Sequence, residues 1–270
     1  MGQKSNLLTL RKKTNINFLN LQSCDLTYVN TFILFIKKFF DRKKIYLTNI
    51  SFNFLSNQIV VGLSLFFRVA MLSKLKRKYK RKGIKINLIK KKININFFKQ
   101  IMARLKTNLI FLSIINLNKY YDKLLFKSFY EEFKEYHTAL FPRRFNFFID
   151  FLKITTLFRK LKIDLNFYLS VIGDIFKILP KRRHNYFLSF IQKFLKKLID
   201  EDSRFNDKNA LKGLKFMLSG RITAKPRAKF KYFQLGKIPL QSIDSNVDFS
   251  KIHVFTIYGV FGLKLWTFRN

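Results

Sequence analysis

Cysteine is almost absent from the chain, and histidine is rare. Cys24 is the only cysteine in 270 residues, and the three histidines are His137, His184 and His253. A single cysteine cannot form an internal disulfide or a zinc knuckle. The histidines also lack the paired spacing of metal-binding motifs. The sequence therefore predicts no metal ion and no other cofactor.

Acidic residues are scarce as well. The chain has 15 Asp and Glu residues against 54 Lys and Arg, which gives a formal net charge of +39. Enzymes that cut or join nucleic acids with metal ions need clustered carboxylates, but the acids here are scattered. The three consecutive acids Asp200-Glu201-Asp202 lie in the polar segment 200–209, where we expect a surface loop. Because the chain also shows no nucleophile–base pair and no phosphate-binding loop, we predict that it is not an enzyme.

The excess of positive charge calls for an anionic partner. Like charges within a compact protein repel one another and lower its stability. The phosphate backbone of RNA or DNA is the commonest partner that neutralises them. Apolar residues make up 48% of the chain, which is too many for a disordered basic tail. We expect a folded, nucleic-acid-binding protein of one large domain or two ordinary ones.

Glycine and proline, with nine and four residues, are also few, whereas Lys, Asn, Ile, Phe, Leu and Tyr are abundant. The abundant residues are those of A/T-rich codons, so the composition favours an A/T-rich genome such as that of an organelle. The first residues predict neither a secretory signal nor an import leader. This is what we expect of a protein made in the compartment where it works.

Residues 219–270 carry an ordered series of short motifs. A predicted strand ends in Ser219-Gly220-Arg221, a turn follows at Gly236-Lys237-Ile238-Pro239-Leu240, and the chain closes on Tyr258-Gly259-Val260-Phe261-Gly262-Leu263-Lys264-Leu265-Trp266. In this order the motifs resemble the C-terminal domain of the universal small-subunit ribosomal protein S3 family. The opening Met1-Gly2-Gln3-Lys4 resembles the N-terminus of the same family.

The resemblance implies a structural constituent of the small ribosomal subunit head, which works in translation as part of a ribonucleoprotein. Its partners would be small-subunit rRNA, the mRNA at the channel through which it enters, and neighbouring head proteins. The Lys225-Pro226-Arg227 segment resembles organellar forms, and we expect a mitochondrial ribosome rather than a plastid one. The implied fold class is α+β, with a degenerate KH-like N-terminal domain, a helical insertion, and a C-terminal domain of two helices packed on an antiparallel sheet.

The KH-like part is expected over residues 25–92. Apolar spacing predicts a helix over 26–40, and alternation predicts strands over 45–55 and 58–67, which is the helix–strand–strand order of that module. The module is degenerate because no Gly-x-x-Gly loop, which clamps phosphates in KH domains, follows the strands. The acid-free basic run 74–92 stands in its place, and we expect it to contact rRNA.

Two further segments complete the predicted domain organisation. Residues 1–24 form a basic arm that either orders on RNA or stays a solvated terminus. Residues 93–161 are predicted to be a lineage-specific helical insertion, whose aromatic residues serve packing. Apolar spacing predicts its helices over 97–112, 118–137 and 145–161.

The C-terminal domain is expected over residues 162–270. Helices are predicted over 165–179 and 185–199, with Arg182 and Arg183 between them matching a basic pair of the family. The family's next basic pair falls on Phe187 and Leu188, so the grip on mRNA stays an open question. A basic loop is predicted over 221–231. The predicted RNA-binding residues are Lys4, Arg11, Lys12, Lys13, Lys76, Arg77, Lys78, Lys80, Arg81, Lys82, Arg182, Arg183, Lys193, Lys196, Lys197, Arg221, Lys225, Arg227, Lys229 and Lys231.

Two alternative classes remain beside the ribosomal one. The first is an intron-encoded maturase or another nucleic-acid-processing enzyme, which the scattered acids disfavour. The second is a basic membrane protein, because residues 45–67 carry no charge and a spanning helix needs about 20 predominantly apolar residues. Polar residues interrupt this stretch throughout, so two strands explain it better than one spanning helix, and we expect no stable membrane insertion.

Overall fold

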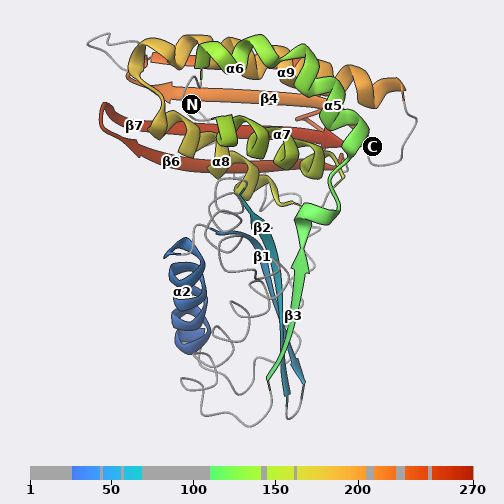
Figure 1. Cartoon of the computed structure of the whole chain (residues 1–270), viewed down its shortest axis with the longest axis vertical. Helices are drawn as coiled ribbons and strands as arrows, with labels where there is room; N and C mark the ends of the chain where they lie inside the picture. Colours follow the sequence, from blue (N-terminus) through green and yellow to red (C-terminus); the bar gives the residue numbers. More distant parts are fainter. Residues whose placement is uncertain are drawn as a thin grey trace, which may run out of the picture. The chain divides into compact units, whose positions relative to one another are not determined.

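The described part of the chain divides between Tyr121 and Asp122 into an N-terminal and a C-terminal unit (Figure 1). The computed structural model describes residues 26–42, 45–55, 58–68, 110–140, 145–160, 163–204, 210–222, 229–242 and 245–269. The predicted basic arm 1–24 and basic run 74–92 lie outside these residues, as does most of the helix predicted over 97–112.

The N-terminal unit is a helix on a three-stranded sheet of order β1-β2-β3. β1 and β2 form an antiparallel hairpin, whereas β3 pairs with β2 in parallel. Both hairpin strands and the first helix were predicted, because their apolar residues recur at the period of each element. The elements are α2 (Leu26–Arg42), β1 (Ile45–Leu55), β2 (Gln58–Phe67), β3 (Ile110–Asn116) and the 3-10 turn η1 (Leu117–Lys119).

The core of this unit lies between α2 and the sheet. Ile36 and Phe40 of α2 are buried together with Ile45, Leu63 and Leu65 of the strands. In η1, which follows β3, the side chain of Asn118 makes two hydrogen bonds with the backbone of Phe67. Its Oδ1 accepts from the Phe67 amide at 2.7 Å, and its Nδ2 donates to the Phe67 carbonyl at 2.9 Å. These bonds satisfy the polar groups where β2 ends.

One expectation about the N-terminal half is wrong, and one is confirmed. Residues 110–112, predicted as the end of the helix 97–112, lie in the strand β3, because a short apolar run fits a helix or a strand equally well until its partner strand is known. In the uncharged stretch, residues 45–55 and 58–67 form the strands β1 and β2, as predicted. Among the described residues, no helix combines the length and apolar character that a membrane crossing requires.

The C-terminal unit is built on a four-stranded antiparallel sheet of order β5-β4-β7-β6. The expected antiparallel sheet is therefore present. On β4, Leu214, Phe216 and Leu218 share one face, as their alternation predicts, and all three are buried. The strands are β4 (Leu211–Gly220), β5 (Lys229–Gly236), β6 (Val247–Thr256) and β7 (Gly259–Arg269).

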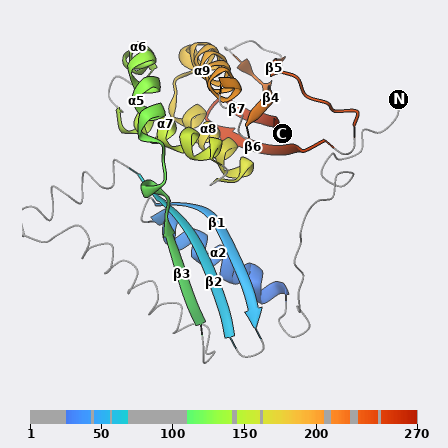
Figure 2. The ribbon, with the colours of Figure 1, turned by 90° about the vertical axis from the view of Figure 1, so that its right-hand side faces the viewer.

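Helices cover one face of this sheet. α8 packs on β6 and β7, α9 packs on β4 and β5, and α5, α6 and α7 pack against these two helices, as Figure 2 shows. The two helices expected here are joined by three more in the described part of the unit. The helices are α5 (Lys123–Glu132), α6 (Lys134–Leu140), α7 (Phe145–Arg159), α8 (Leu165–Ile178) and α9 (His184–Arg204), with the 3-10 turn η2 (Lys181–Arg183) before α9.

The segment 93–161, predicted as one insertion, is thus shared between the two units. Its strand β3 completes the N-terminal sheet, and its helices α5–α7 belong to the C-terminal unit, which begins at Asp122 and not at 162. The polar segment 200–209 is also not a loop at its start, because α9 continues through residue 204. Polar residues extend an exposed helix end as readily as they form a loop.

Aromatic side chains bind the outer helices to α9. Phe194 lies 5.1 Å from Phe129 of α5 and 5.5 Å from Phe151 of α7, measured between ring centroids. Phe190, one turn earlier, packs 6.0 Å from Phe148. All these rings are buried, and most meet at the tilted or edge-to-face angles that aromatic pairs favour.

Two local contacts bring the layers close. Gly173 of α8 faces the sheet, where a Cβ atom would lie 2.6 Å from Val254 Cγ2, so only glycine lets α8 approach β6 this closely. Arg269, near the end of β7, is buried, and its guanidinium donates to the carbonyls of Phe158 (3.1 Å) and Arg159 (3.3 Å). A cation at the C-terminus of α7 complements the helix dipole there.

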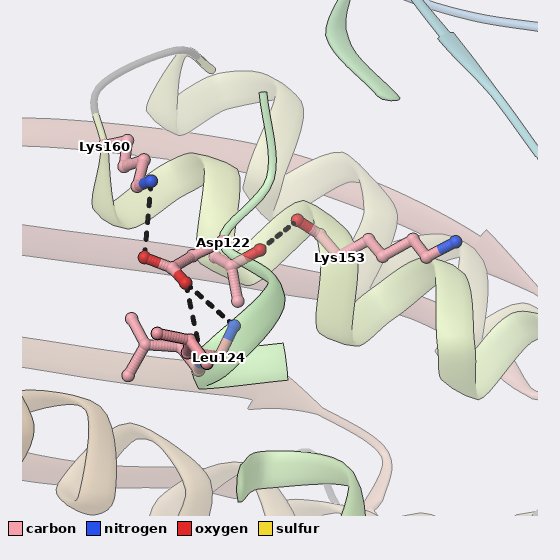
Figure 3. Close-up of polar contacts among 6 residues, drawn as sticks. Asp122, Leu124, Lys153 and Lys160 are labelled. Atoms are coloured by element: carbon pink, nitrogen blue, oxygen red, sulfur yellow. Dashed lines mark hydrogen bonds and ion pairs between the residues drawn. The ribbon is translucent and has the colours of Figure 1, made fainter. Parts of the chain in front are cut away.

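Asp122 caps α5 and connects it with α7 (Figure 3). Its carboxylate accepts from the amides of Leu124 (3.0 Å) and Leu125 (3.4 Å) and pairs with the Lys160 ammonium at 3.3 Å. Burial acts to raise the pKa of Asp122, but the hydrogen bonds from the Leu125 amide and from Lys160, together with the Lys160 charge, outweigh it, so the pKa is lowered. The carboxylate therefore stays charged at neutral pH.

Shortening Phe194 to alanine should destabilise the C-terminal unit by about 3–5 kcal/mol, because it leaves a cavity between α9, α5 and α7. Urea unfolding of the full chain measures the change. Leu124→Ala is the matched control, since Leu124 is 80% exposed and its loss should change stability by less than about 0.5 kcal/mol. Equal effects of the two substitutions would contradict the packing described here.

Asp122→Ala should cost about 1 kcal/mol, because it removes the cap of α5. Asp122→Asn keeps a capping oxygen and loses only the exposed pair with Lys160, which is worth less than about 1 kcal/mol. Amide hydrogen exchange in the first turn of α5 reports the difference. If the two variants exchange equally fast, the ion pair and not the cap holds this helix.

Candidate nucleic-acid interface

Three basic residues form η2, the short turn between α8 and α9. Leu179 and Pro180 are extended, with ψ of 138° and 149°, because proline cannot continue α8. The Arg183 amide then donates to the Pro180 carbonyl at 2.9 Å and starts the turn. This geometry places the side chains of Lys181, Arg182 and Arg183 together at one end of the C-terminal unit.

His184 fixes this end to the sheet. Its ring is fully buried and packs edge-to-face on Phe176 of α8, on Phe261 of β7 and on Tyr258 of the β6–β7 turn. Its Nε2 lies 3.1 Å from the Leu179 carbonyl. Burial lowers the pKa of His184, and the nearby Lys181 charge lowers it further, while its backbone hydrogen bonds oppose the shift in part. The ring is therefore neutral at pH 7 and serves packing.

The sheet brings two more predicted residues to the same end. Lys231 of β5 donates from Nζ to Asn185 Oδ1 at 2.8 Å, next to the start of α9. Arg221 follows directly after β4, whose last residues pair with Lys229 of β5 and Gly262 of β7. Arg182, Arg183, Arg221 and Lys231, which lie far apart in the sequence, thus share one end of the fold.

These cations differ in their exposure to solvent. Arg182 and Arg221 are exposed. Arg183 is half-buried, and its Nη1 donates to the Leu140 carbonyl at the end of α6 over 3.1 Å. Lys181, which was left out of the predicted set, lies with Nζ 5.4 Å from the centre of the Tyr258 ring. Lys181 directly precedes Arg182 and Arg183 in the sequence, and this position could have led us to include it. We call Lys181, Arg182, Arg183, Arg221 and Lys231 the basic end.

The predicted lysines further along α9 do not join the basic end. Lys193 and Lys196 are exposed, whereas Lys197 pairs with Glu132 of α5. At 1.5 Å per residue, Lys196 lies about 18 Å along the helix from its first residue. A hydrogen bond with Tyr136 raises the pKa of Lys193, whose Nζ lies 5.5 Å from that ring.

Phe187 and Leu188, where the family's second basic pair was expected, are both buried. Positions in the apolar core cannot hold charged side chains without a large desolvation penalty. The absence of basic residues there is therefore a consequence of packing in this chain. Any grip on a nucleic acid along α9 has to come from the exposed lysines instead.

The remaining predicted residues are not placed. The side chain of Lys229 and the whole of Lys225 and Arg227 lie outside the description, together with all predicted residues from Lys4 to Lys82. The basic loop expected over 221–231 is shorter than predicted, because β5 already begins at Lys229. The alternation of Lys and aromatic residues over 229–233 indicates this strand. The high density of positive charge led us to predict a loop instead.

Comparison with known proteins finds a similarity in this region. The family "Ribosomal protein S3, C-terminal domain" matches residues 193–267. Residues 193–267 are therefore similar to the C-terminal domain of ribosomal protein S3. The match covers α9 from residue 193 onward, the strands β4, β5 and β6, and β7 up to residue 267, and it includes the motifs at 219–221, 236–240 and 258–266.

Curated relatives agree with this assignment. Small ribosomal subunit protein uS3c of Arabis hirsuta is 38% identical over 77 residues, which are 28% of this chain and 34% of that protein. The Draba nemorosa protein of the same name has the same values, and that of Aethionema cordifolium is 36% identical over 77 residues. The aligned part of the chain thus spans about a third of the length of these relatives.

The residues that match the S3 domain and the basic end overlap in part. Lys193, Lys196, Lys197, Arg221 and Lys231 lie inside the matched residues, whereas η2 precedes them. The contacts of His184 and Asn185 attach η2 to the matched sheet, so the basic end is one structural feature even though only part of it falls in the matched region.

Lowering the pH below about 6.5 should destabilise the C-terminal unit through His184. Its pKa is lowered in the folded state, so the unfolded chain takes up this proton first as the pH falls. The free energy of unfolding then drops by up to about 1.4 kcal/mol per pH unit until the folded-state pKa is passed. His184→Gln should lack this share of the pH dependence.

Urea unfolding between pH 7.5 and 5 measures it. His137, whose pKa is also lowered by burial, should contribute with the same sign, so His137→Gln serves as the comparison. Carboxylate titrations are common to all three chains and cancel in the difference. An unchanged pH dependence in His184→Gln would show that this ring is protonated or solvated in the fold.

Proposed function

We propose that the chain is a structural, non-catalytic constituent of the small ribosomal subunit head, where it binds rRNA. The observation that carries the proposal is the ribosomal protein S3 C-terminal domain at residues 193–267. The relatives matched over this region are named small ribosomal subunit proteins. A formal net charge of +39 agrees with a partner as rich in phosphate as rRNA.

The basic end is the surface we assign to RNA. Its five cations come from η2, from the residue after β4 and from β5, and they converge at one end of the C-terminal unit. Arginine binds phosphate oxygens through two parallel hydrogen bonds, and lysine does so as a point charge. Such contacts position a protein on nucleic acid without reading sequence. In this assignment the basic end faces rRNA or the channel through which mRNA enters, and Lys193 and Lys196 extend the contact along α9.

The N-terminal unit would support this role as a KH-like module. Its order of a helix, two antiparallel strands and a third strand parallel to the second supports the assignment, which stays a proposal. Neighbouring head proteins would be its further partners, and the basic arm 1–24 and run 74–92 would add rRNA contacts.

The ribosome in question would be an organellar one. The A/T-rich codon composition favours an organelle, and the sequence led us to expect the mitochondrion. The matched relatives are chloroplast proteins and do not support that choice over the plastid. We therefore propose an organellar ribosome and leave the mitochondrion as the expectation from composition.

Sedimentation of a native detergent extract in a sucrose gradient at low magnesium tests the proposal. Detergent removes membrane association, and low magnesium separates the two ribosomal subunits. We expect the chain, followed by mass spectrometry, to migrate with the small-subunit rRNA in stoichiometric amounts. Migration as a free protein would refute the ribosomal role and favour a maturase-like enzyme instead.

Removing two cations of the basic end, in Arg182→Gln/Lys231→Gln, should weaken binding to small-subunit rRNA. Each lost phosphate contact should reduce the log–log salt slope by about 0.7–0.9. Lys127→Gln/Lys134→Gln, which removes the same charge from exposed positions of α5 and α6, is the control. Filter binding over a range of salt concentrations measures both, and equal slopes in the two variants would show that only net charge matters.

A further inference from the structure

The face of the C-terminal sheet opposite the helices is rich in exposed aromatic residues. All described helices of this unit lie on the other face (Figure 2). On the open face, Phe230 and Tyr232 of β5 are 63% and 64% exposed, and Phe255 of β6 is 73% exposed. Exposed rings gathered on one sheet face indicate a surface that another molecule covers.

The strand register arranges this open face in rows. Lys215 of β4, Trp266 of β7 and Phe249 of β6 are cross-strand neighbours. The Lys215 ammonium lies 5.6 Å from the centre of the Trp266 ring, and that ring lies 5.0 Å from Phe249. Phe230 and Tyr232 lie 6.3 Å apart with their planes only 23° from parallel.

The next row carries uncompensated positive charge. Lys251 of β6 and Lys264 of β7 are direct cross-strand partners, and like charges at such positions repel. The described residues of the four strands contain one acid, Asp248. Its pairing with the buried Thr267 places it on the helix face. The open face therefore combines aromatic rings with lysines and no carboxylate from these strands.

This combination distinguishes between possible occupants. Protein–protein interfaces are enriched in aromatic residues but depleted in lysine. Surfaces that bind single-stranded nucleic acid combine both, because bases stack on the rings while cations follow the phosphates. Four-stranded sheets whose outward aromatic residues stack bases are a known mode of RNA recognition. A second copy of this chain would bring further positive charge to the lysines and increase the repulsion.

The geometry points to the open face of the β5-β4-β7-β6 sheet as a second RNA-binding surface, which holds single-stranded RNA. Phe230 and Tyr232 stack two bases at the β5 edge. Lys264 and Lys251 neutralise the phosphates of the RNA backbone as it crosses the sheet towards β6. Lys215, Trp266 and Phe249 lie along one side of the bound RNA. This surface is separate from the basic end, and it does not depend on the chain being ribosomal.

Fluorescence anisotropy of the purified full chain with a short labelled oligouridylate tests the inference. At about 0.3 M KCl, where non-specific phosphate contacts are weak, Phe230→Ala/Tyr232→Ala should bind about tenfold more weakly or worse, because each lost stack removes a substantial share of affinity. Phe230→Tyr/Tyr232→Phe keeps both rings and should bind within about twofold of the wild type.

A charge variant provides the second arm. Lys251→Gln/Lys264→Gln should weaken binding and flatten the salt dependence, and it should not lower the melting temperature, because it removes a repulsion. Lys127→Gln/Lys134→Gln on the helical side is the matched control and should keep wild-type affinity at this salt concentration. Thermal unfolding verifies that every variant is folded.

Ultraviolet crosslinking locates the contact. Nucleotides attached to Phe230 or Tyr232 support the inference. Wild-type affinity of the double-alanine variant, or crosslinks confined to η2 and α9, would overturn it and assign the open face to a protein partner. These results are independent of sedimentation. The chain could sediment apart from the small subunit while Phe230→Ala/Tyr232→Ala still lowers the affinity for oligouridylate. That pair of results would refute the proposed function and leave this inference standing.

Discussion

The C-terminal unit depends on the burial of aromatic rings along one side of α9. Phe190 and Phe194 hold α5 and α7, and Phe187 meets Phe176 of α8. Rings of this size account for much of the energy of a core. They set the position of α9 over the sheet, and with it the position of η2 and the basic end. The arrangement of the basic end therefore depends on apolar contacts made by the buried side of α9.

Two different surfaces for an anionic partner follow from this arrangement. The basic end collects arginine and lysine from segments that meet only in the fold, and its chemistry suits phosphate without regard to sequence. The open sheet face offers rings as well as lysines, and its chemistry suits unpaired bases. The basic end would bind a structured region of RNA, and the open sheet face of the same unit would bind the single strand that continues from it.

Much of the local structure could be predicted from periodicity. Strands over 45–55 and 58–67 and helices near 26–40, 145–161 and 165–179 were expected and are present, because their apolar residues repeat at the period of the element that buries them. The motifs at 219–221, 236–240 and 258–266 predicted a resemblance to the S3 C-terminal domain, and the family match over residues 193–267 includes all three. Gly236 shows why such a motif is informative, since its φ of +68° requires glycine at the end of β5.

The errors share a physical origin. The strand at 110–116 and the strand β5 are short and lie at sheet edges, so their identity depends on partner strands that no local pattern reveals. The assignment of α5–α7 to the C-terminal unit also depended on distant contacts, because nothing near Phe129 or Phe151 indicates that both would meet Phe194. For the same reason the burial of Phe187 and Leu188 was not foreseen.

The sequence by itself indicated an anionic partner, because like charges that sum to +39 repel one another. It also indicated the similarity to the S3 C-terminal domain, because the motifs follow one another in order. Only the tertiary structure decided which cations act together. It brought Lys231 to Asn185 and Arg221 to the end of the sheet, placed Lys197 on Glu132, and set Lys251 opposite Lys264 on an open face. Strand pairing and helix packing join residues far apart in the chain, and these long-range contacts are not encoded in any local pattern.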